Sequence, residues 1–283
     1  SPSLGGRMMG GRDARAPAWR LLLLVVAIVW PAAVAAALEP GPTATVVETV
    51  DGDTVVLDDG SEVRLVGLQA PKLPLGRRNF PTWPLAAESR ALLAEMVDGR
   101  RVQLRFGGAR MDRHGRHLAH LFLDEGAVGE GAAGEDSAWV QGAMLRAGMA
   151  RVYSFADNRA RVPEMLALEA EARAAGRGIW ALRFYAVRPH DRLDRDIGTF
   201  QLIEGRVLNA SVVRGRGFLN FGEGWRTDFT ITLPPDTVRL FRREGLDVRD
   251  YADRTVRVRG WLRTRDGPQV EVTHPEQIEV LDP

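Results

Sequence analysis

The segment Val50–Val56 constrains the fold most strongly, because it places the turn Asp51-Gly52-Asp53 between two runs of β-branched residues. Such side chains favour strands, and Asp-Gly is a common pair in tight hairpin turns. The chain returns through a further apolar run that ends at Val66. We therefore predict a three-stranded meander over Ala44–Val66, in which Asp51 and Gly52 have a structural role.

Three charged residues stand at defined places in and after this meander. Asp53 leaves the turn, Arg64 lies inside an apolar strand, and Arg116 ends the turn that begins at Asp112 and precedes another apolar run. Each has an ordinary explanation, since Asp53 could serve the turn alone and Arg64 could belong to the polar face of a strand. Together, one carboxylate and two guanidinium groups are the parts needed to bind a phosphodiester beside a cation.

The order and spacing of these residues resemble the staphylococcal-nuclease-like (thermonuclease) family. The resemblance extends from about Ala44 to Leu182 and includes the helical segment Trp139–Val152 and the residues Glu169 and Ile179-Trp180. It implies an α+β fold that is mainly β, with a five-stranded OB-like barrel and three helices.

The resemblance also implies roles for single residues. In the family, two aspartates and a backbone carbonyl hold Ca²⁺, and these positions fall on Asp53, Gln69 and Ala70. A glutamate that activates the attacking water falls on Lys72. Gln69 offers an oxygen without charge, and Lys72 is a cation that only donates hydrogen bonds.

Two arginines of the family bind the phosphate and stabilise its transition state, and they match Arg64 and Arg116. The resemblance thus implies that Arg64 and Arg116 are catalytic if the site is active. With Lys72, the chain's single lysine, they are also the candidate substrate-binding residues.

The charge of this site differs from that of the family. The family's three carboxylates carry about −3, whereas Asp53, Gln69 and Lys72 sum to about 0. One unit of charge about 5 Å from a divalent ion is worth roughly 6 kcal/mol at an effective dielectric near 20. We therefore expect little Ca²⁺ affinity, and a local charge of about +2 from Arg64, Arg116, Lys72 and Asp53 that suits a phosphate.

Three functions follow from these observations. The favoured one is a thermonuclease-family protein with an altered site that binds phosphate or nucleic acid and cuts slowly or not at all. The second is an active, metal-dependent endonuclease on DNA or RNA. The third is a non-catalytic interaction module of the cell envelope. Nothing in the sequence specifies an oligomeric state.

The N-terminus has the pattern of a targeting segment. Arg12, Arg15 and Arg20 precede the apolar run Leu21–Trp30, which is followed by Pro31 and the small residues Ala32–Ala37. This pattern is typical of a cleaved secretory signal, and an uncleaved membrane anchor is the alternative. Either one predicts a periplasmic or secreted protein with no other membrane segment.

Four parts are predicted along the chain: a signal peptide or anchor (residues 1–37), the nuclease-like domain (43–185), a linker (186–196) and a second OB-like barrel (197–283). Composition limits the chemistry. There is no cysteine, and the net charge of +1 includes about +3 from residues 1–37, which leaves a near-neutral remainder. Such a remainder lacks the basic excess of a tight nucleic-acid binder, so any polynucleotide contact should be local.

The pattern of apolar residues predicts further elements. In the first domain we expect helices over Leu85–Val97, Trp139–Ala147 and Pro163–Ala175, strands over Val102–Phe106 and Leu118–Leu123, and a surface insertion over Asp124–Asp136. In the second we expect a helix over Asp236–Arg243 and strands over Phe200–Leu208, Phe218–Phe221, Phe229–Leu233, Thr255–Leu262 and Gln269–Val272.

Several polar and aromatic residues have two interpretations. His114, His117 and His120 lie where a strand would point the last two to opposite faces, which argues against a zinc site. Glu88 and Glu169 are predicted to partner buried polar groups, with Glu88 the nearest substitute for a missing base. Phe218, Phe221 and Trp225 could stack on bases, but we favour packing in the second barrel or on the interdomain face.

Overall fold

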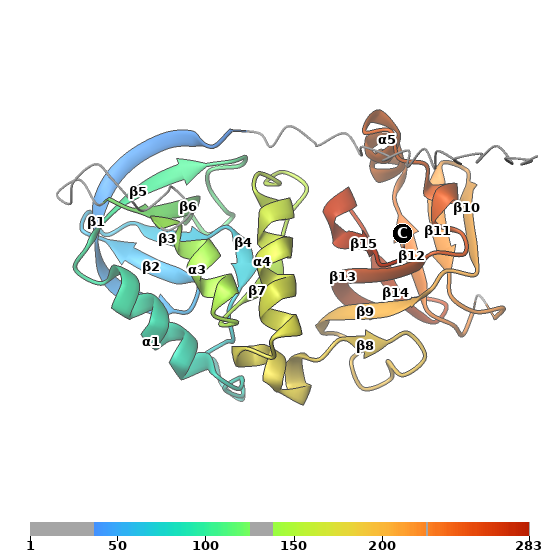
Figure 1. Ribbon diagram of the computed structural model, residues 1–283, viewed down its shortest axis with the longest axis horizontal. Coiled ribbons are helices and arrows are strands. Elements are labelled where there is room, and N and C mark those ends of the chain that lie inside the picture. The colour runs from blue at the N-terminus through green and yellow to red at the C-terminus, as the bar shows by residue number, and fades with distance from the viewer. Residues whose placement is uncertain (1–36, 125–137, 225, 283) are drawn as a thin grey trace, which may run out of the picture. The chain divides into compact units, whose positions relative to one another are not determined.

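The computed structural model describes residues 37–124, 138–224 and 226–282 (Figure 1). The targeting segment expected over residues 1–37 and the insertion expected over Asp124–Asp136 lie outside the described residues, apart from residue 37 and Asp124. Among the described residues, no helix is both long and apolar enough to cross a membrane.

The first half of the chain forms a closed barrel of five strands in the order β1-β2-β3-β6-β5. The strands are β1 (Glu39–Asp51), β2 (Thr54–Leu57), β3 (Glu62–Leu65), β5 (Arg101–Phe106) and β6 (His117–Leu123). Only the β3–β6 pair is parallel, and the antiparallel β1–β5 pair closes the ring. The predicted meander and barrel are confirmed.

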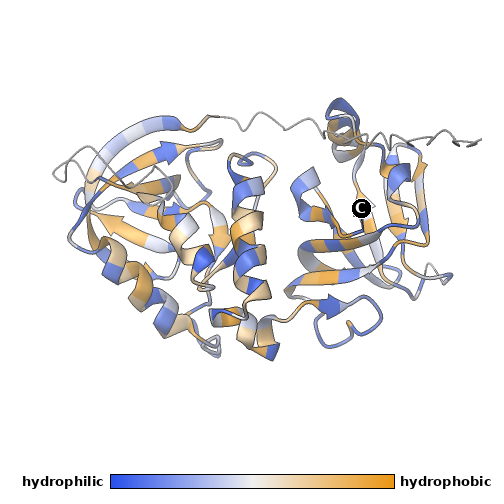
Figure 2. Ribbon diagram, viewed as in Figure 1, coloured by the Kyte–Doolittle hydropathy of each residue, from blue (hydrophilic) through white to orange (hydrophobic). Residues whose placement is uncertain are grey.

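Among the described residues, three α-helices accompany the barrel: α1 (Ala86–Val97), α3 (Val140–Arg146) and α4 (Val162–Ala174). Helix α3 contacts both β6 and α4, so it lies between the barrel and the last helix (Figure 1). Both apolar and hydrophilic residues occur along α1 and α4 (Figure 2), and the buried residues of α1, namely Ala86, Ser89, Leu93 and Val97, recur every three to four positions and so share one face.

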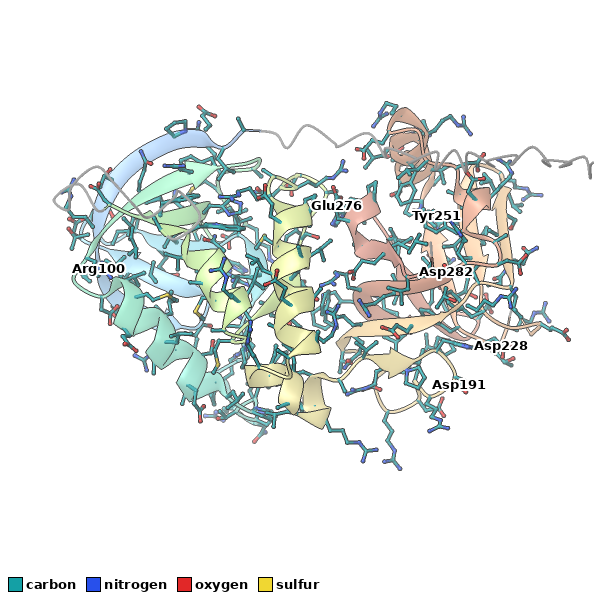
Figure 3. All side chains as sticks on the ribbon, in the orientation of Figure 1. Arg100, Asp191, Asp228, Tyr251, Glu276 and Asp282 are labelled. Carbon is teal, nitrogen blue, oxygen red and sulfur yellow. The ribbon has the colours of Figure 1, made fainter. Side chains whose placement is uncertain are left out.

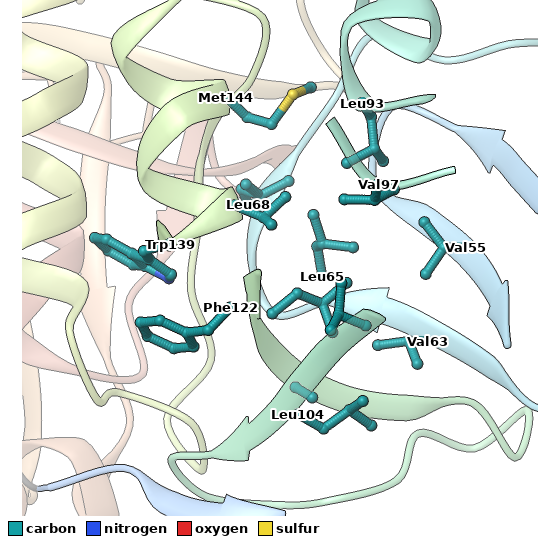
Figure 4. Close-up of a cluster of buried hydrophobic side chains, with 14 of the residues drawn as sticks. Val55, Val63, Leu65, Leu68, Leu93, Val97, Leu104, Phe122, Trp139 and Met144 are labelled. Atoms are coloured by element: carbon teal, nitrogen blue, oxygen red, sulfur yellow. The ribbon is translucent and has the colours of Figure 1, made fainter. Parts of the chain in front are cut away.

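The barrel core follows from the two-residue period of its strands. In β5, for example, Val102, Leu104 and Phe106 are buried and the residues between them are not. The inward side chains meet Leu93 of α1 and Trp139 at the start of α3 (Figure 4). The confirmed α+β class therefore rests on alternation that is visible in the sequence.

The second half of the chain contains an eight-stranded sheet around a core of its own. Its elements are β8 (Arg188–Pro189), β9 (Phe200–Arg206), β10 (Asn209–Val213), β11 (Arg216–Asn220), β12 (Thr230–Leu233), α5 (Pro235–Arg243), β13 (Thr255–Thr264), β14 (Pro268–Glu271) and β15 (Ile278–Val280). All five predicted strands are present, and α5 lies in the predicted gap.

Strands β8, β10 and β15 were not predicted. β10 pairs with β11 through a tight turn at Arg214-Gly215, and Arg214 has a φ of 50°. Glycine, asparagine or aspartate usually occupies such a position, so the turn gave no sequence signal. β8 lies in the predicted linker and pairs with β9, while Leu193 of the same segment is buried in the second core. The boundaries predicted for the two domains stay predictions.

The eight-stranded sheet and its core are called the second barrel, although its described strands do not close into a ring as those of the first barrel do. Both halves belong to one compact unit, and a buried ion pair joins them. Glu169 of α4 receives two hydrogen bonds of 2.9 Å from Arg259 of β13, and both side chains are 1% exposed or less. Glu169 also accepts a 2.6 Å bond from the backbone N–H of Val152, in β7 (Arg151–Tyr153). Burial alone would raise the pKa of Glu169, but Arg259, Val152 and Arg173 outweigh it and the pKa is lowered.

Further contacts surround this ion pair. Arg159 binds both Glu244 and Glu276. Of these residues, Glu276 is labelled in Figure 3. Ser154 lies 2.7 Å from Nε2 of His274, and Trp261 donates a 2.9 Å bond to the hydroxyl of Tyr153. The contact between the barrels is therefore largely polar, and its most deeply buried part is the pair of Glu169 and Arg259.

Substitution of Arg259 by Met should lower the free energy of unfolding by about 3–5 kcal/mol, because it leaves the Glu169 carboxylate buried without its main partner. Urea denaturation followed by circular dichroism measures the change. Arg263→Met, at an exposed position of the same strand, should change stability by less than about 0.5 kcal/mol. Equal effects of the two substitutions would contradict the role of the ion pair.

The same pair gives stability a pH dependence. Because the folded-state pKa of Glu169 is lowered, its contribution is fully present above the unfolded value of about 4.3 and is lost as pH falls further. The difference between wild type and Arg259→Met should therefore shrink as the solution is acidified.

Candidate functional site

Asp53 is the centre of the candidate site, and the turn before β2 buries it completely. The Asp51 carboxylate accepts a 3.0 Å hydrogen bond from the Asp53 N–H, which fixes the turn. A side chain at Gly52 would collide with Ser89 of α1 and with Ala70. Helix α1 thus packs on the turn only because residue 52 is glycine.

Four donors surround the Asp53 carboxylate, and one of them is the hydroxyl of the adjacent Thr54, which lies 3.3 Å from Oδ1. Arg64 lies 3.0 Å from Oδ1, since Arg64 is in register with Thr54, the next residue along the chain. Oδ2 accepts bonds of 2.7 Å from the Ala70 N–H and 2.6 Å from the Lys72 ammonium. Burial alone would raise the pKa of Asp53, but Arg64, Lys72 and Ala70 together hold it well below its usual range.

A second carboxylate shares the ammonium. Nζ of Lys72 lies 3.7 Å from Oδ2 of Asp51, which is 4% exposed. Burial and the neighbouring charge of Asp53 raise the pKa of Asp51, while Lys72 opposes that rise. The Lys72 ammonium therefore lies against both carboxylates, in the place where a bound cation would neutralise them.

Arg116 does not join this cluster. Its Nε donates a 2.7 Å bond to Asp112, whose other oxygen caps the turn by accepting from the N–H groups of His114 and Arg116. Arg116 lines a separate hollow of about 520 Å³ with Glu62 and His114. Of the three cations expected around Asp53, Arg64 and Lys72 contact it, whereas Arg116 contacts Asp112.

The expected local charge of about +2 also needs correction. Asp51 contributes a carboxylate that the sequence argument left out, and Arg116 has Asp112 as its own partner. Taken as fully ionised, Asp51 and Asp53 balance Arg64 and Lys72. The cluster is close to neutral rather than strongly cationic.

Gln69 faces a different partner. Its Oε1 accepts bonds of 3.0 and 2.8 Å from Arg151 of β7, which pairs with β4 (Gly67–Gln69). Arg151 is 4% exposed and lies over the rings of Phe200, Trp83 and Tyr185. The oxygen that the family resemblance assigned to a metal is therefore occupied by a guanidinium group.

Ala70 enters the cluster through its N–H, which binds Asp53. The donor set does not fit Ca²⁺, because an ammonium lies against the two carboxylates and the Gln69 oxygen points to Arg151. Within the ranges that the structure describes, no three residues among His, Asp and Glu are grouped to hold a metal ion.

The other polar residues singled out in the sequence lie outside the Asp53 cluster. Glu88 is exposed, so the prediction that it partners a buried polar group is wrong. Glu169 occupies the buried ion pair with Arg259. His120 is buried and accepts a 3.2 Å bond from the Trp139 indole, whereas His114 is exposed. Phe221 packs in the second core, as favoured, and Trp225 lies outside the described residues.

Comparison with known proteins places the first barrel in a class. Residues 62–182 match the sequence profile of the family described as "Staphylococcal nuclease homologue". Residues 62–182 of this chain therefore resemble a staphylococcal-nuclease-like domain. Nucleases of this family typically use Ca²⁺ and bind nucleic acid.

Two relatives give the extent of the likeness. An uncharacterized protein of Bacillus anthracis is 27% identical over 151 residues, which cover 52% of this chain and 64% of that protein. A thermonuclease of Staphylococcus hyicus is 27% identical over 117 residues, which cover 36% of this chain and 68% of that protein. The chain thus spans less than two thirds of the first relative.

Replacement of Lys72 by Met should lower the free energy of unfolding by about 1–3 kcal/mol, because two buried carboxylates lose a shared cation. Urea denaturation in EDTA measures the change. Arg78→Met, at an exposed position in the same loop, is the matched control and should have little effect. A Lys72→Met protein as stable as wild type at neutral pH would show that the ammonium does not neutralise this cluster.

Proposed function

We propose that this protein works outside the cytoplasm, binds nucleic acid or phosphorylated ligands, and lacks calcium-dependent cleavage at the Asp53 site. One observation carries the proposal: the Lys72 ammonium lies 2.6 Å from Asp53 and 3.7 Å from Asp51. It supplies the positive charge that a metal ion would otherwise bring to these carboxylates.

Electrostatics support the loss of metal binding. A divalent ion about 4 Å from the ammonium would be repelled by roughly 8 kcal/mol at an effective dielectric near 20. A cation of that charge would have to displace Lys72 from its hydrogen bond with Asp53. Nor can the ammonium accept a proton from an attacking water, because it has donors only.

The spare donors of the cluster support anion binding. Among the described residues, the Lys72 ammonium makes one hydrogen bond, of 2.6 Å, to Asp53, which leaves two of its three hydrogens for a ligand. The Lys72 and Arg64 side chains are 18% and 15% exposed. Arg64 is oriented by bonds to the backbone oxygens of Asp53 and Leu68. A phosphate would compete with Asp53 for these donors, so its binding should be weak and sensitive to salt.

The location outside the cytoplasm rests on the sequence alone. The arginines before Leu21–Trp30 and the small residues that follow support either a cleaved signal or a membrane anchor. The absence of cysteine is compatible with both. Fractionation of cells that express the full chain, with sequencing of the mature N-terminus, separates these two routes.

Calcium gives the sharpest test of the altered site. Millimolar Ca²⁺ should leave the melting temperature of wild type unchanged, and a DNA zymogram with Ca²⁺ should show no cleavage. Lys72→Glu should make the melting temperature depend on Ca²⁺, because it groups a third carboxylate with Asp51 and Asp53. The neutral control Lys72→Gln should show a much smaller dependence.

Cleavage should remain slow in Lys72→Glu, since Arg151 still holds Gln69, and should increase when Gln69→Asp is added. Calcium-dependent hydrolysis by the wild-type protein that EDTA abolishes would overturn the proposal and establish an active endonuclease.

The single lysine gives a test of anion binding. Amine acetylation can modify only Lys72 and the chain's N-terminal amine, so peptide mass spectrometry reads both in one sample. A nucleoside bisphosphate at low salt should slow acetylation of Lys72, added salt should restore it, and the N-terminal amine is the internal control. Equal labelling of Lys72 with and without the bisphosphate would refute binding at this site.

A further inference from the structure

A groove of about 1230 Å³ lies on the second sheet. It lies on the face opposite the core, as the two-residue period of the strands shows. In β11, Leu219 packs in the core and Phe218 lines the groove; in β12, Ile231 packs in the core and Thr232 lines it. In β13, Leu262 packs in the core and Trp261 lines the groove.

Aromatic side chains gather at one end of this groove. Tyr153 lies 5.0 Å from Phe155 and 4.7 Å from Phe200, and Phe200 lies 6.4 Å from Trp261, measured between ring centroids. Phe155 and Trp261 remain 47% and 43% exposed. Large exposed rings that line a cavity are available to stack on a planar ligand.

Charged side chains lie along the rest of the groove, and arginine outnumbers the acids. Arg216 pairs with Glu271 at 3.3 Å. Arg263 and Arg265, beside Asp266 at the turn between β13 and β14, are exposed. Threonine side chains of β12 and the glutamine of β14 also line the groove.

We propose that this groove binds single-stranded nucleic acid, with bases stacked on Trp261 and Phe155 and phosphates on Arg263 and Arg265. Stacking on exposed rings together with guanidinium contacts to the backbone is the general way in which proteins hold single strands without sequence preference. The arginines favour this ligand over an uncharged glycan, which would use the rings but not the guanidinium groups. The site is separate from the Asp53 cluster and does not depend on it.

The test is fluorescence anisotropy of a labelled oligothymidine with the full chain. Trp261→Ala should weaken binding roughly tenfold or more, the usual worth of one stacked base. Trp261→Phe, which keeps a ring but loses the bond to Tyr153, should bind nearly as wild type does and so separates stacking from folding. Arg263→Gln should reduce the slope of log affinity against log salt by about 0.7.

Two controls locate the site. Lys72→Gln should weaken oligothymidine binding far less than Trp261→Ala does, because phosphate contacts at the Asp53 site are weak, so failure of the groove and failure of the Asp53 site are distinguishable. Arg249→Gln, on the second barrel but outside the groove, should have no effect. The proposal is overturned if oligothymidine does not bind at low salt, if Lys72→Gln rather than Trp261→Ala removes binding, or if an uncharged chito-oligosaccharide binds and oligothymidine does not.

Discussion

The buried carboxylate of Glu169 organises this molecule. It binds Arg259 of the second barrel and the backbone N–H of Val152, so it fixes the three-residue strand β7. Each residue of that strand then serves a different region. Arg151 donates hydrogen bonds to Gln69 of the candidate site, and the Val152 N–H donates one to Glu169. The hydroxyl of Tyr153 accepts a hydrogen bond from Trp261 in the groove. The ion pair of Glu169 and Arg259 therefore helps to position residues of the candidate site and of the groove on the second sheet.

The Asp53 cluster shows how a site can keep its architecture while its chemistry changes. The turn, the register of Arg64 with Thr54, and the N–H of Ala70 still surround a buried carboxylate. The Lys72 ammonium lies against the Asp51 and Asp53 carboxylates and is covalently part of the chain. It cannot dissociate, so the fold carries a permanent counter-ion for these two carboxylates.

Much of the barrel could be predicted from the sequence, because strand alternation and the Asp51-Gly52-Asp53 turn are local signals. The contact of Arg64 with Asp53 followed from the same hairpin register. The hydrogen bonds of Gln69 and Glu169 could not be predicted from the sequence. Gln69 and Arg151 lie 82 residues apart, and Glu169 and Arg259 lie 90 apart, so no local pattern joins them. The Arg116–Asp112 pair spans only four residues, and their opposite charges could have suggested it.

Strand β8 has a consequence for any attempt to separate the barrels. It lies in the segment that connects them and covers the edge of β9 through its parallel pairing with residues Ile203 and Glu204. A truncation within this segment would uncover that edge, and an unpaired edge strand promotes aggregation. The isolated second barrel would also expose the Arg259 guanidinium that Glu169 now buries. Poor solubility of such fragments would result from loss of these contacts between the two halves rather than from intrinsic instability of either half.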